Sequence, residues 1–403
     1  MGALSHLKVL DLTRVLAGPW AAQILADLGA EVIKIENPRG GDDTRSWGPP
    51  FMAGVDGQAT GESAYYLCTN RGKQSVCIDM KSPEGQAQLR ELARHCDVLI
   101  ENFKVGGAAK FGLDYDSLAP LNPGLVYCSI TGFGQTGPYK NRAGYDFLVQ
   151  AMGGLMSITG QPDGEAGAGP QKVGVALTDI MTGLYAGIGI LAALAERDRS
   201  GLGQHVDLAL LDVTAATLAN QATNYLVGGV DPTRLGNAHP NIVPYQSFET
   251  RDGYLIVAVG NDAQFRRYAD LLGAPELADD ERFASNQARV RNRSTLAPLL
   301  QQKMLERDKD EWLALLEAAG VPAGPINTVA EVFADPQILA RDMRVTVPHP
   351  DNPDLELVGS PLKLSRTPVQ YRRPPPTLGQ DTQSVLERLA AGAPFGGAGD
   401  TPD

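Results

Sequence analysis

The chain is poor in the residues that build metal centres. It has five histidines and four cysteines among 403 residues, and neither Cys-x-x-Cys nor His-x-x-x-His occurs. We therefore expect no metal site. No secretory leader is expected before the first strand-like segment, which favours reduced thiols and a cytoplasmic protein.

Excess positive charge is also missing. The formal net charge is −12, which argues against general binding of nucleic acids. Residues 1–110 are nearly neutral, with 12 Lys and Arg against 13 Asp and Glu, so most of the negative charge lies further along. An anionic ligand is expected on this N-terminal part, although a chance distribution would give the same counts.

The common nucleotide and nucleophile motifs are absent. The first loop, "TRVLAGPWAA", lacks the Gly-x-Gly-x-x-Gly of dinucleotide folds, which disfavours a nicotinamide or flavin enzyme. No Walker-type lysine loop and no Gly-x-Ser-x-Gly elbow occurs. The uncharged run Ile180–Ala195 is shorter than the ~20 residues of a membrane span, so we expect a buried helix there and no membrane partner.

What the first half does contain is alternating strand and helix patterns, which are typical of a parallel sheet. Strands are predicted at 7–12, 31–36, 75–80, 97–103, 125–133 and 204–210. Helices are predicted at 18–29, 82–96, 145–155, 178–198 and 211–227. The fold class is therefore α/β, with a Rossmann-like large domain.

A change of composition marks a second domain. Residues 228–241 read as a linker, and 245–259 as a hairpin turned at Asp252-Gly253. Helices follow near 262–272, 292–306 and 309–319. We predict a large domain at 1–227, completed by 326–403, and a smaller α+β domain at 228–325. Strand-like pieces ("RVTV", "LELV", "PLKLS") precede a Pro/Gly-rich tail that we expect to be mobile.

Asp179 is the sharpest single feature, because a carboxylate stands at the front of the apolar run. Thr178 or Asp179 is predicted to cap or begin the helix, and capping is the commoner use of such an aspartate. Gly183 and Gly187 share one helix face, where another backbone can approach closely. Either Asp179 caps a buried helix, or a site there needs a desolvated carboxylate.

The other candidate residues have ordinary explanations. Asp146 opens an amphipathic helix and reads equally well as a cap. Solvated surface charge is the default for the cations near strand ends and loops. These are Arg39, Arg45, Arg71, Lys73, Lys104, Lys110 and Arg142.

Several segments together resemble the class III CoA-transferases, the relatives of formyl-CoA transferase and the crotonobetainyl-CoA:carnitine enzyme. They are "LDLTRVLAGPWAAQILADLGAEVIKIENPRGGDDTR", "NRGKQSVCIDMKSPEG", "DVLIENF", "GFGQTGPYKNRAGYDFLVQAMGGLMSITG" and "DIMTGLYAGIGILAALAERDRSGLGQHVDLALLD". The likeness covers nearly the whole chain, with the motifs in the right order.

The resemblance implies a role for individual residues. It makes Asp179 the nucleophile that forms an aspartyl-CoA thioester, and Asp146, after Tyr145, the assisting acid. The implied contacts with CoA are Val15, Leu16, Ala17, Arg39, Arg71, Lys73, Gln74, Asn102, Phe103, Lys110, Arg142 and Tyr145. Formyl-CoA transferase has glutamine where this chain has Leu16 and arginine where it has Asn37, so Arg39 is the candidate for the adenine side. The resemblance implies acyl-CoA and a carboxylic acid as substrates, no permanently bound cofactor, and an interlocked homodimer.

The segment "GNAHPN" (236–241) departs from formyl-CoA transferase, which has a glycine-rich loop over its active site. Residues 236–260 instead resemble the succinyl-CoA-dependent dicarboxylate enzymes, so His239, Pro240 and Asn241 are the implied substrate loop. Succinyl-CoA as donor and glutarate or malate as acceptor follow from that likeness. Two alternatives stay open: an α-methylacyl-CoA racemase of the same fold, disfavoured because no histidine precedes Asp146, and a CoA-binding module without catalysis.

Overall fold

The computed structural model describes residues 2–396 and divides them into two compact units. The first comprises residues 2–154, 173–218 and 336–396, and the second comprises 155–172 and 219–335. These bounds differ from the predicted ones, because 155–172, 219–227 and 326–335 belong with the second unit. These three segments have the same kinds of residues as the segments next to them, so composition alone does not show that they belong to the second unit.

The first unit is built on a six-stranded sheet in which every strand is parallel to its neighbours. The strand order is β5-β2-β1-β6-β7-β8. The bounds are β1 (Lys8–Asp11), β2 (Glu31–Glu36), β5 (Lys73–Cys77), β6 (Val98–Glu101), β7 (Val126–Thr131) and β8 (His205–Ala209). The predicted α/β class and parallel sheet are confirmed. Strand β5 lies about two residues earlier than predicted, because its ladder with β2 spans Lys73 to Cys77.

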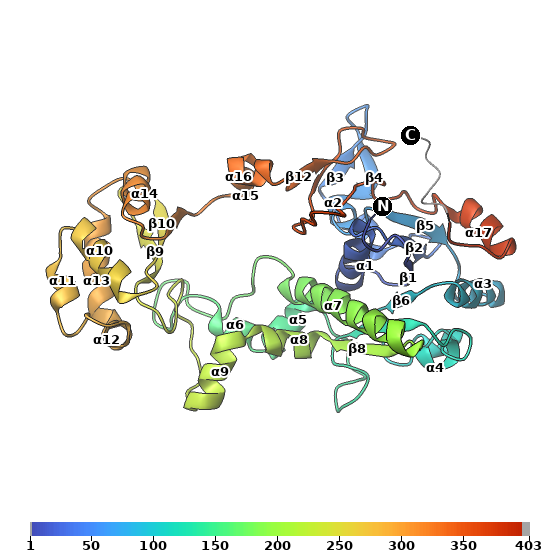
Figure 1. Ribbon diagram of the computed structural model, residues 1–403, viewed down its shortest axis with the longest axis horizontal. Helices are drawn as coiled ribbons and strands as arrows, with labels where there is room; N and C mark the ends of the chain where they lie inside the picture. Colours follow the sequence, from blue (N-terminus) through green and yellow to red (C-terminus); the bar gives the residue numbers. More distant parts are fainter. Residues whose placement is uncertain (1, 397–403) are drawn as a thin grey trace. The chain divides into compact units, whose positions relative to one another are not determined.

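Helices cover both faces of this sheet, as buried parallel strands require. One face carries Val9 and packs against α1 (Ala17–Asp27), α7 (Leu177–Ser200) and α8 (Leu210–Thr217). The other face carries Leu10 and packs against α3 (Pro83–Arg94), α4 (Tyr115–Leu118) and α17 (Thr382–Ala390). Figure 1 shows α17 beside α3 at the β5 edge of the sheet. Successive β1 residues thus serve two separate cores.

The helix ends follow local chemistry. Ser82 caps α3 by accepting the Gly85 N–H, with Pro83 as the first helical residue, as predicted. Gly201 ends α7 in the left-handed region with φ 76°. Helix α7 begins at Leu177 after Ala176, so the prediction that Thr178 or Asp179 caps it or begins it is wrong. Asp179 is instead the third residue of the first turn.

The predicted helix at 211–227 is two helices. Helix α8 ends at Thr217, and α9 (Ala219–Gly228) begins two residues later. Its first residue, Ala219, has a φ of 48°, which breaks the helical path between the two. The break falls where the chain leaves the first unit, so tertiary structure divides a continuous helical pattern. Helix α5 (Asp146–Met152) and α6 (Leu155–Ile158) replace the predicted helix at 145–155.

The end of the chain is more ordered than predicted. Val385 of α17 and Phe395 are buried in the core on the α3 face, so the expected mobile tail is wrong up to residue 396. Strands β12 (Arg344–Thr346) and β13 (Glu356–Val358) confirm two of the strand-like pieces, whereas "PLKLS" is not a strand. The remaining elements of this unit are η1 (Asp43–Ser46), β3 (Phe51–Ala53), β4 (Ala59–Ser63), α2 (Ala64–Leu67), η2 (Ala109–Phe111) and α16 (Pro336–Ala340).

The second unit has its own core around an antiparallel sheet of order β11-β10-β9. Strands β9 (Tyr245–Glu249) and β10 (Tyr254–Ala258) form the predicted hairpin, and β11 (Ala323–Pro325) adds an unpredicted third strand. Phe248, Phe265 and Trp312 are buried between sheet and helices. Besides α6 and α9, the helices of this unit are α10 (Asp262–Leu271), α11 (Glu276–Asp279), α12 (Asn286–Arg291), α13 (Arg293–Met304), α14 (Lys309–Ala318) and α15 (Val329–Ala334).

Helix α7 is longer than its uncharged run. It has 24 residues and is long and apolar enough, by length and composition, to cross a membrane. Within the first unit, however, it packs against α1, α8, β7 and β8. It also ends in charged residues, including Arg197 and Arg199 in its last turn. This packing agrees with the predicted core helix.

Candidate active site

The strand order itself favours a binding crevice. From β1 the chain builds one side of the sheet outwards through β2 to β5, then returns to β6 on the other side of β1 and builds outwards through β7 to β8. In open parallel sheets, ligands bind at the carboxyl ends of the strands at such a switch point. The loop after β1 holds Val15 and Leu16 and leads into Ala17, the first residue of α1, and the loop after β6 holds Asn102 and Phe103. The structure thus brings five of the predicted contact residues to one edge of the sheet.

The two loops are joined directly by an amide side chain. Asn102 donates from Nδ2 to the Arg14 carbonyl at 2.7 Å and accepts the Arg14 N–H on Oδ1 at 3.2 Å. The Phe103 N–H donates to the buried Glu101 carboxyl at 2.7 Å. Burial raises the pKa of Glu101 to about 7.

A close contact between α1 and α7 brings the loop after β1 to Asp179. A Cβ added at Gly183 would lie 2.8 Å from the Ala17 carbonyl oxygen and 3.0 Å from the Trp20 side chain. Only glycine fits this approach without displacement, which confirms the prediction for Gly183. The same prediction is wrong for Gly187, where a Cβ would meet nothing within 4 Å. Gly183 lies one turn after Asp179, so Ala17 and Asp179 belong to one region.

Asp179 lies in an electrostatically unfavourable position. Its backbone N–H donates to Asp146 Oδ1 at 3.2 Å, and the other oxygen of Asp146 accepts from Gln150 Nε2 at 2.7 Å. Burial, and then the negative charge of Asp146, raise the pKa of Asp179 from 3.8 to about 7. A carboxyl group with such a pKa is a candidate for chemistry near neutral pH, because its environment stabilises the charged form poorly.

The Asp146 carboxylate is held in place by Gln150, a buried residue of the same helix. It is the first residue of α5, as predicted, and Gln150 is fully buried one turn later. The Gln150 side chain also accepts the Val173 N–H at 3.0 Å. One buried amide therefore connects Asp146 to the segment that leads into α7.

A second group of charges lies beneath the loop after β1. Val15 has φ 75° and donates its N–H to the Asp42 carboxylate, which also pairs with Lys34 at 2.9 Å. Burial raises the pKa of Asp42, but the Lys34 charge and the hydrogen bonds to Thr44 outweigh burial and lower it to about 2. Asp42 is therefore ionised at neutral pH.

Of the seven cations expected to be solvated surface charges, four are exposed: Arg39, Lys104, Lys110 and Arg142. The expectation is wrong for Arg45, Arg71 and Lys73, which are buried and paired with carboxylates. Arg39 follows β2, Lys110 lies in η2, and Arg142 lies over the ring of Tyr139 at 3.9 Å. Tyr145 precedes α5 and is 67% exposed.

Three other predicted contacts have side chains that are paired inside the protein, and of these only Lys73 reaches the two ends of the loop after β1. The Arg71 guanidinium pairs with Asp27 at 2.6 Å and donates to the Val358 carbonyl. Gln74 binds Glu31 and accepts from Arg388. The buried ammonium of Lys73 donates to Asp11, Pro19 and Asn70.

The predicted substrate loop belongs to the second unit. His239 Nδ1 accepts the Asn241 N–H at 3.0 Å, and the His239 ring packs on Tyr245. Arg293 donates to the carbonyls of His239 and Pro240. Burial, and then the charge of Arg293, lower the pKa of His239 below its usual value, so the ring is neutral.

Tyr65 is a residue that the sequence did not single out. Burial and, next, the charge of Asp179 raise its pKa to about 12, and Asp146 adds to the same effect. Its phenol is therefore a neutral hydrogen-bond donor in the electrostatic field of both carboxylates. The only sequence signal is the pair Tyr65-Tyr66 in α2, which does not reveal which ring is buried in the core.

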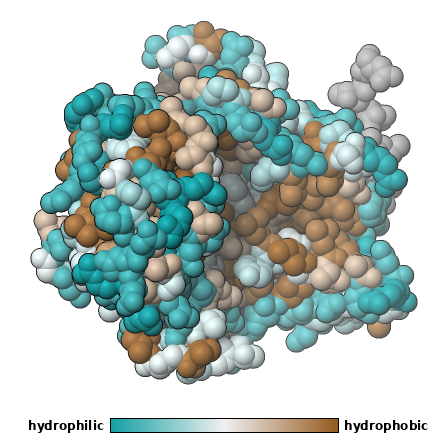
Figure 2. Space-filling view, turned by 60° about the vertical axis from the view of Figure 1, so that its left-hand side comes forward, coloured by the Kyte–Doolittle hydropathy of each residue, from teal (hydrophilic) through white to brown (hydrophobic). Residues whose placement is uncertain are grey.

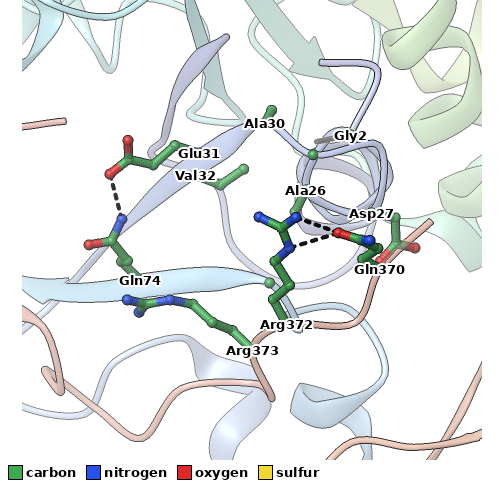
Figure 3. Close-up of a pocket in the computed structure, with 12 residues that line it drawn as sticks. Gly2, Ala26, Asp27, Ala30, Glu31, Val32, Gln74, Gln370, Arg372 and Arg373 are labelled. Carbon is green, nitrogen blue, oxygen red and sulfur yellow. Dashed lines mark hydrogen bonds between the residues drawn. The ribbon is translucent and has the colours of Figure 1, made fainter. Parts of the chain in front are cut away.

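A cleft at the opposite edge of the sheet is not part of this region. It is lined by residues at the amino ends of β2 and β5, including Glu31 and Gln74, and by Arg372 and Arg373 (Figure 3). The polar groups there largely pair with one another, as Gln74 does with Glu31. Among residues 2–396, no group of three His, Cys, Asp or Glu side chains is arranged to hold a metal ion.

Comparison with known proteins decides the family. Residues 4–382 match CoA-transferase family III. The chain belongs to CoA-transferase family III. It is 55% identical to a succinate–glutarate CoA-transferase of Agrobacterium fabrum, over 96% of this chain and 95% of the relative. It is 44% identical to the human succinyl-CoA:glutarate CoA-transferase, over 96% of this chain and 86% of that protein.

A solved structure agrees with this assignment. A CAIB/BAIF family protein from Brucella suis superimposes with a TM-score of 0.84 at 51% identity, covering 96% of this chain and 99% of that one. This chain is therefore a CoA-transferase, and CoA thioesters are its substrates.

The raised pKa of Asp179 makes a prediction about stability. The folded chain binds this proton more tightly than the unfolded chain, so this group's contribution to the free energy of unfolding falls as the pH rises from 3.8 to about 7. Asp179→Asn should therefore be more stable than the wild type at pH 8, by about 1–3 kcal/mol, and the gain should vanish near pH 4. Chemical denaturation at both pH values measures this. Asp212→Asn, at an exposed acid in the first turn of α8, is the matched control and should show no such gain. A wild type as stable as Asp179→Asn at pH 8 would contradict the desolvated carboxylate.

Proposed function

We propose that this CoA-transferase moves CoA from succinyl-CoA to a free dicarboxylate such as glutarate, through a thioester on Asp179. The observation that carries the proposal is the desolvated Asp179 carboxylate, one helical turn from the contact of α7 with the start of α1. The names of the similar enzymes from Agrobacterium fabrum and human support the choice of acids.

The first half-reaction makes and opens an anhydride. The Asp179 carboxylate attacks the succinyl thioester carbonyl, the C–S bond breaks, and CoA leaves as a thiolate. The thiolate then attacks the Asp179 carbonyl of the mixed anhydride and expels succinate. The enzyme now carries aspartyl-CoA, so the thioester bond is conserved.

The second half-reaction repeats these steps with the acceptor. The incoming carboxylate attacks aspartyl-CoA and releases the thiolate, which attacks the acceptor's carbonyl in the new anhydride. The Asp179 carboxylate leaves, and the acceptor's CoA thioester is the product. Water would hydrolyse both intermediates, which is why a dry position for Asp179 suits the chemistry.

The surroundings of Asp179 fit these steps. A poorly solvated carboxylate is a better nucleophile once ionised, and the position of Asp179 in the first turn of α7 lets the helix dipole offset part of the cost of ionisation. We propose that Asp146 fixes the backbone of Asp179 and that Tyr65 donates a hydrogen bond to the reacting oxygens.

We assign the CoA contacts to the edge of the sheet that Asp179 shares. Val15, Leu16 and Ala17 would meet the pantetheine through their backbone, between Asn102 and Phe103. The exposed cations Arg39, Lys110 and Arg142, with Tyr145, are the groups available to the phosphates and adenine. Lys73 would contribute by supporting this edge, because its ammonium is bonded to Asp11 and Pro19, whereas Arg71 and Gln74 are paired with Asp27 and Glu31 at the opposite edge.

The dicarboxylate preference rests on the loop of the second unit. Because His239 Nδ1 accepts a backbone N–H, the proton of the neutral ring lies on Nε2, which is then a donor. Asn241 Oδ1 already accepts from Asn220 and Asn224, so its amide N–H groups are the donors it can offer a ligand. We propose that both recognise the distal carboxylate, with Pro240 shaping the wall.

We also propose an interlocked homodimer in the cytoplasm. Leu184, Ile188 and Leu191 form a stripe on α7 and are 41%, 63% and 37% exposed. Figure 2 shows apolar residues gathered on a face of the first unit. An apolar patch of this kind usually meets another protein surface.

The covalent step predicts that Asp179→Ala abolishes transfer from succinyl-CoA to glutarate while CoA still binds. The reason is that no other carboxylate takes part in the anhydride. Turnover and the intact mass of protein incubated with succinyl-CoA are the measurements, and Asp212→Ala is the control that should keep both activity and the CoA adduct. Transfer by Asp179→Ala at near the wild-type rate would reject the nucleophile.

The loop predicts a ranking of acceptors by kcat/KM with succinyl-CoA. Glutarate and malate should exceed butyrate and oxalate, because butyrate has no distal carboxylate to accept from His239 Nε2 and the Asn241 amide. His239→Ala should reduce the preference for glutarate over butyrate by about tenfold, a loss of roughly 1.4 kcal/mol. Butyrate or oxalate as the best acceptor, or a ranking unchanged in His239→Ala, would show that the loop does not select the acid.

The dimer predicts a mass in solution twice that of one chain at micromolar concentration. Ile188→Asp, which places a charge in the apolar stripe, should weaken association or lower solubility. Light scattering after size exclusion gives the mass, with the exposed Glu387→Gln on α17 as the control. A monomeric wild type would overturn the proposal.

A further inference from the structure

Val15 has a backbone conformation that its side chain disfavours. Its φ of 75° lies in the left-handed region, where a β-branched side chain is strained. Glycine would adopt this conformation without strain. The surrounding structure must therefore hold Val15 in place.

A buried ion pair provides this hold. Asp42 Oδ1 and Oδ2 accept the Val15 N–H at 3.2 Å and 3.3 Å. Lys34 Nζ donates to Asp42 at 2.9 Å and to the Thr13 carbonyl at 2.8 Å. Both charged side chains are 0% exposed.

Asn102 holds Arg14, the residue between Thr13 and Val15. It bonds to both the N–H and the carbonyl of Arg14. Four successive backbone groups, from the Thr13 carbonyl to the Val15 N–H, are thus each bonded to a side chain from another part of the chain. The loop has no freedom to relax towards a less strained φ.

Stability alone is a poor explanation for Lys34 and Asp42. Removing two charges from water costs several kcal/mol per ion, and apolar residues of similar size often serve a core equally well. What an apolar pair could not do is bind a backbone carbonyl and a backbone N–H of the same loop.

We propose that Lys34 and Asp42 are positioning residues for CoA, which hold the loop after β1 in the strained shape that presents Val15, Leu16 and Ala17 to the ligand. This inference rests on the proposed function, in which that loop contacts CoA. Neither side chain touches the ligand, because both are covered by the loop itself.

The test is the equilibrium Kd for free CoA, measured by calorimetry on the full chain together with the melting temperature. Asp42→Asn keeps the shape but removes the charge, and it should raise Kd by about tenfold while kcat changes by less than about threefold. Asp97→Asn is the matched control, because Asp97 also joins a cation, Arg197, to a backbone N–H, that of Lys8, at the other end of β1. It should lower the melting temperature and leave Kd unchanged.

Val15 variants separate positioning from general damage. In a Val15→Gly background, Asp42→Asn should raise Kd by less than about threefold, since glycine needs no clamp to reach φ 75°. Val15→Pro leaves the buried pair intact but removes the N–H and forbids this φ, so it should weaken CoA binding about tenfold whether or not Asp42→Asn folds.

The outcomes distinguish the two proposals. A wild type that does not bind CoA overturns the proposed function. A wild type that binds CoA, with Kd unchanged in Val15→Pro or in a folded Asp42→Asn, overturns the positioning role alone. Equal losses of affinity in Asp42→Asn and Asp97→Asn would also overturn it, by showing only loss of stability.

Discussion

The contact of α1 with α7 at Gly183 is the constraint on which the site depends. The backbone of Ala17 approaches the α7 axis because Gly183 has no side chain. This contact places the first residues of α1, and so the loop after β1, beside the first turn of α7. The sheet order then brings in the loop after β6, through Asn102. A side chain at Gly183 would push α1 away from α7. It would thereby move Asp179 away from the loop after β1, although neither of these would itself be substituted.

The charges around this contact fall into two groups with opposite character. Near Asp179, a second carboxylate and burial make ionisation costly, and the pKa rises. Beneath the loop after β1, Lys34 and several donors surround Asp42, and its pKa falls. The first arrangement suits a nucleophile, because a carboxylate whose charge is poorly stabilised lowers its free energy when it bonds to carbon. The second suits a group that must keep its geometry throughout the reaction.

The sequence was sufficient for the sheet because its strands and helices repeat a strong local pattern. The cap of α3, the hairpin at Asp252-Gly253 and Asp146 at the start of α5 also follow from local chemistry. Local patterns were insufficient where distant segments decide the outcome. The internal pairing of Arg71 and the break at Ala219 depend on residues far away in the chain, as does the burial of Val385. Tyr65 was missed for the same reason, since its importance comes from carboxylates more than 80 residues away.

The division of the chain has a consequence for the order of events during synthesis. The last strand of the parallel sheet, β8, ends at Ala209, but Val385 and Phe395 complete the core on the α3 face. Asp381 also accepts the Ser75 N–H at the edge of that sheet, in β5. On the ribosome, the whole second unit must therefore emerge before the first can be finished. The apolar core around Val76 stays partly uncovered throughout that interval, when a nascent chain is most exposed to aggregation and to chaperones.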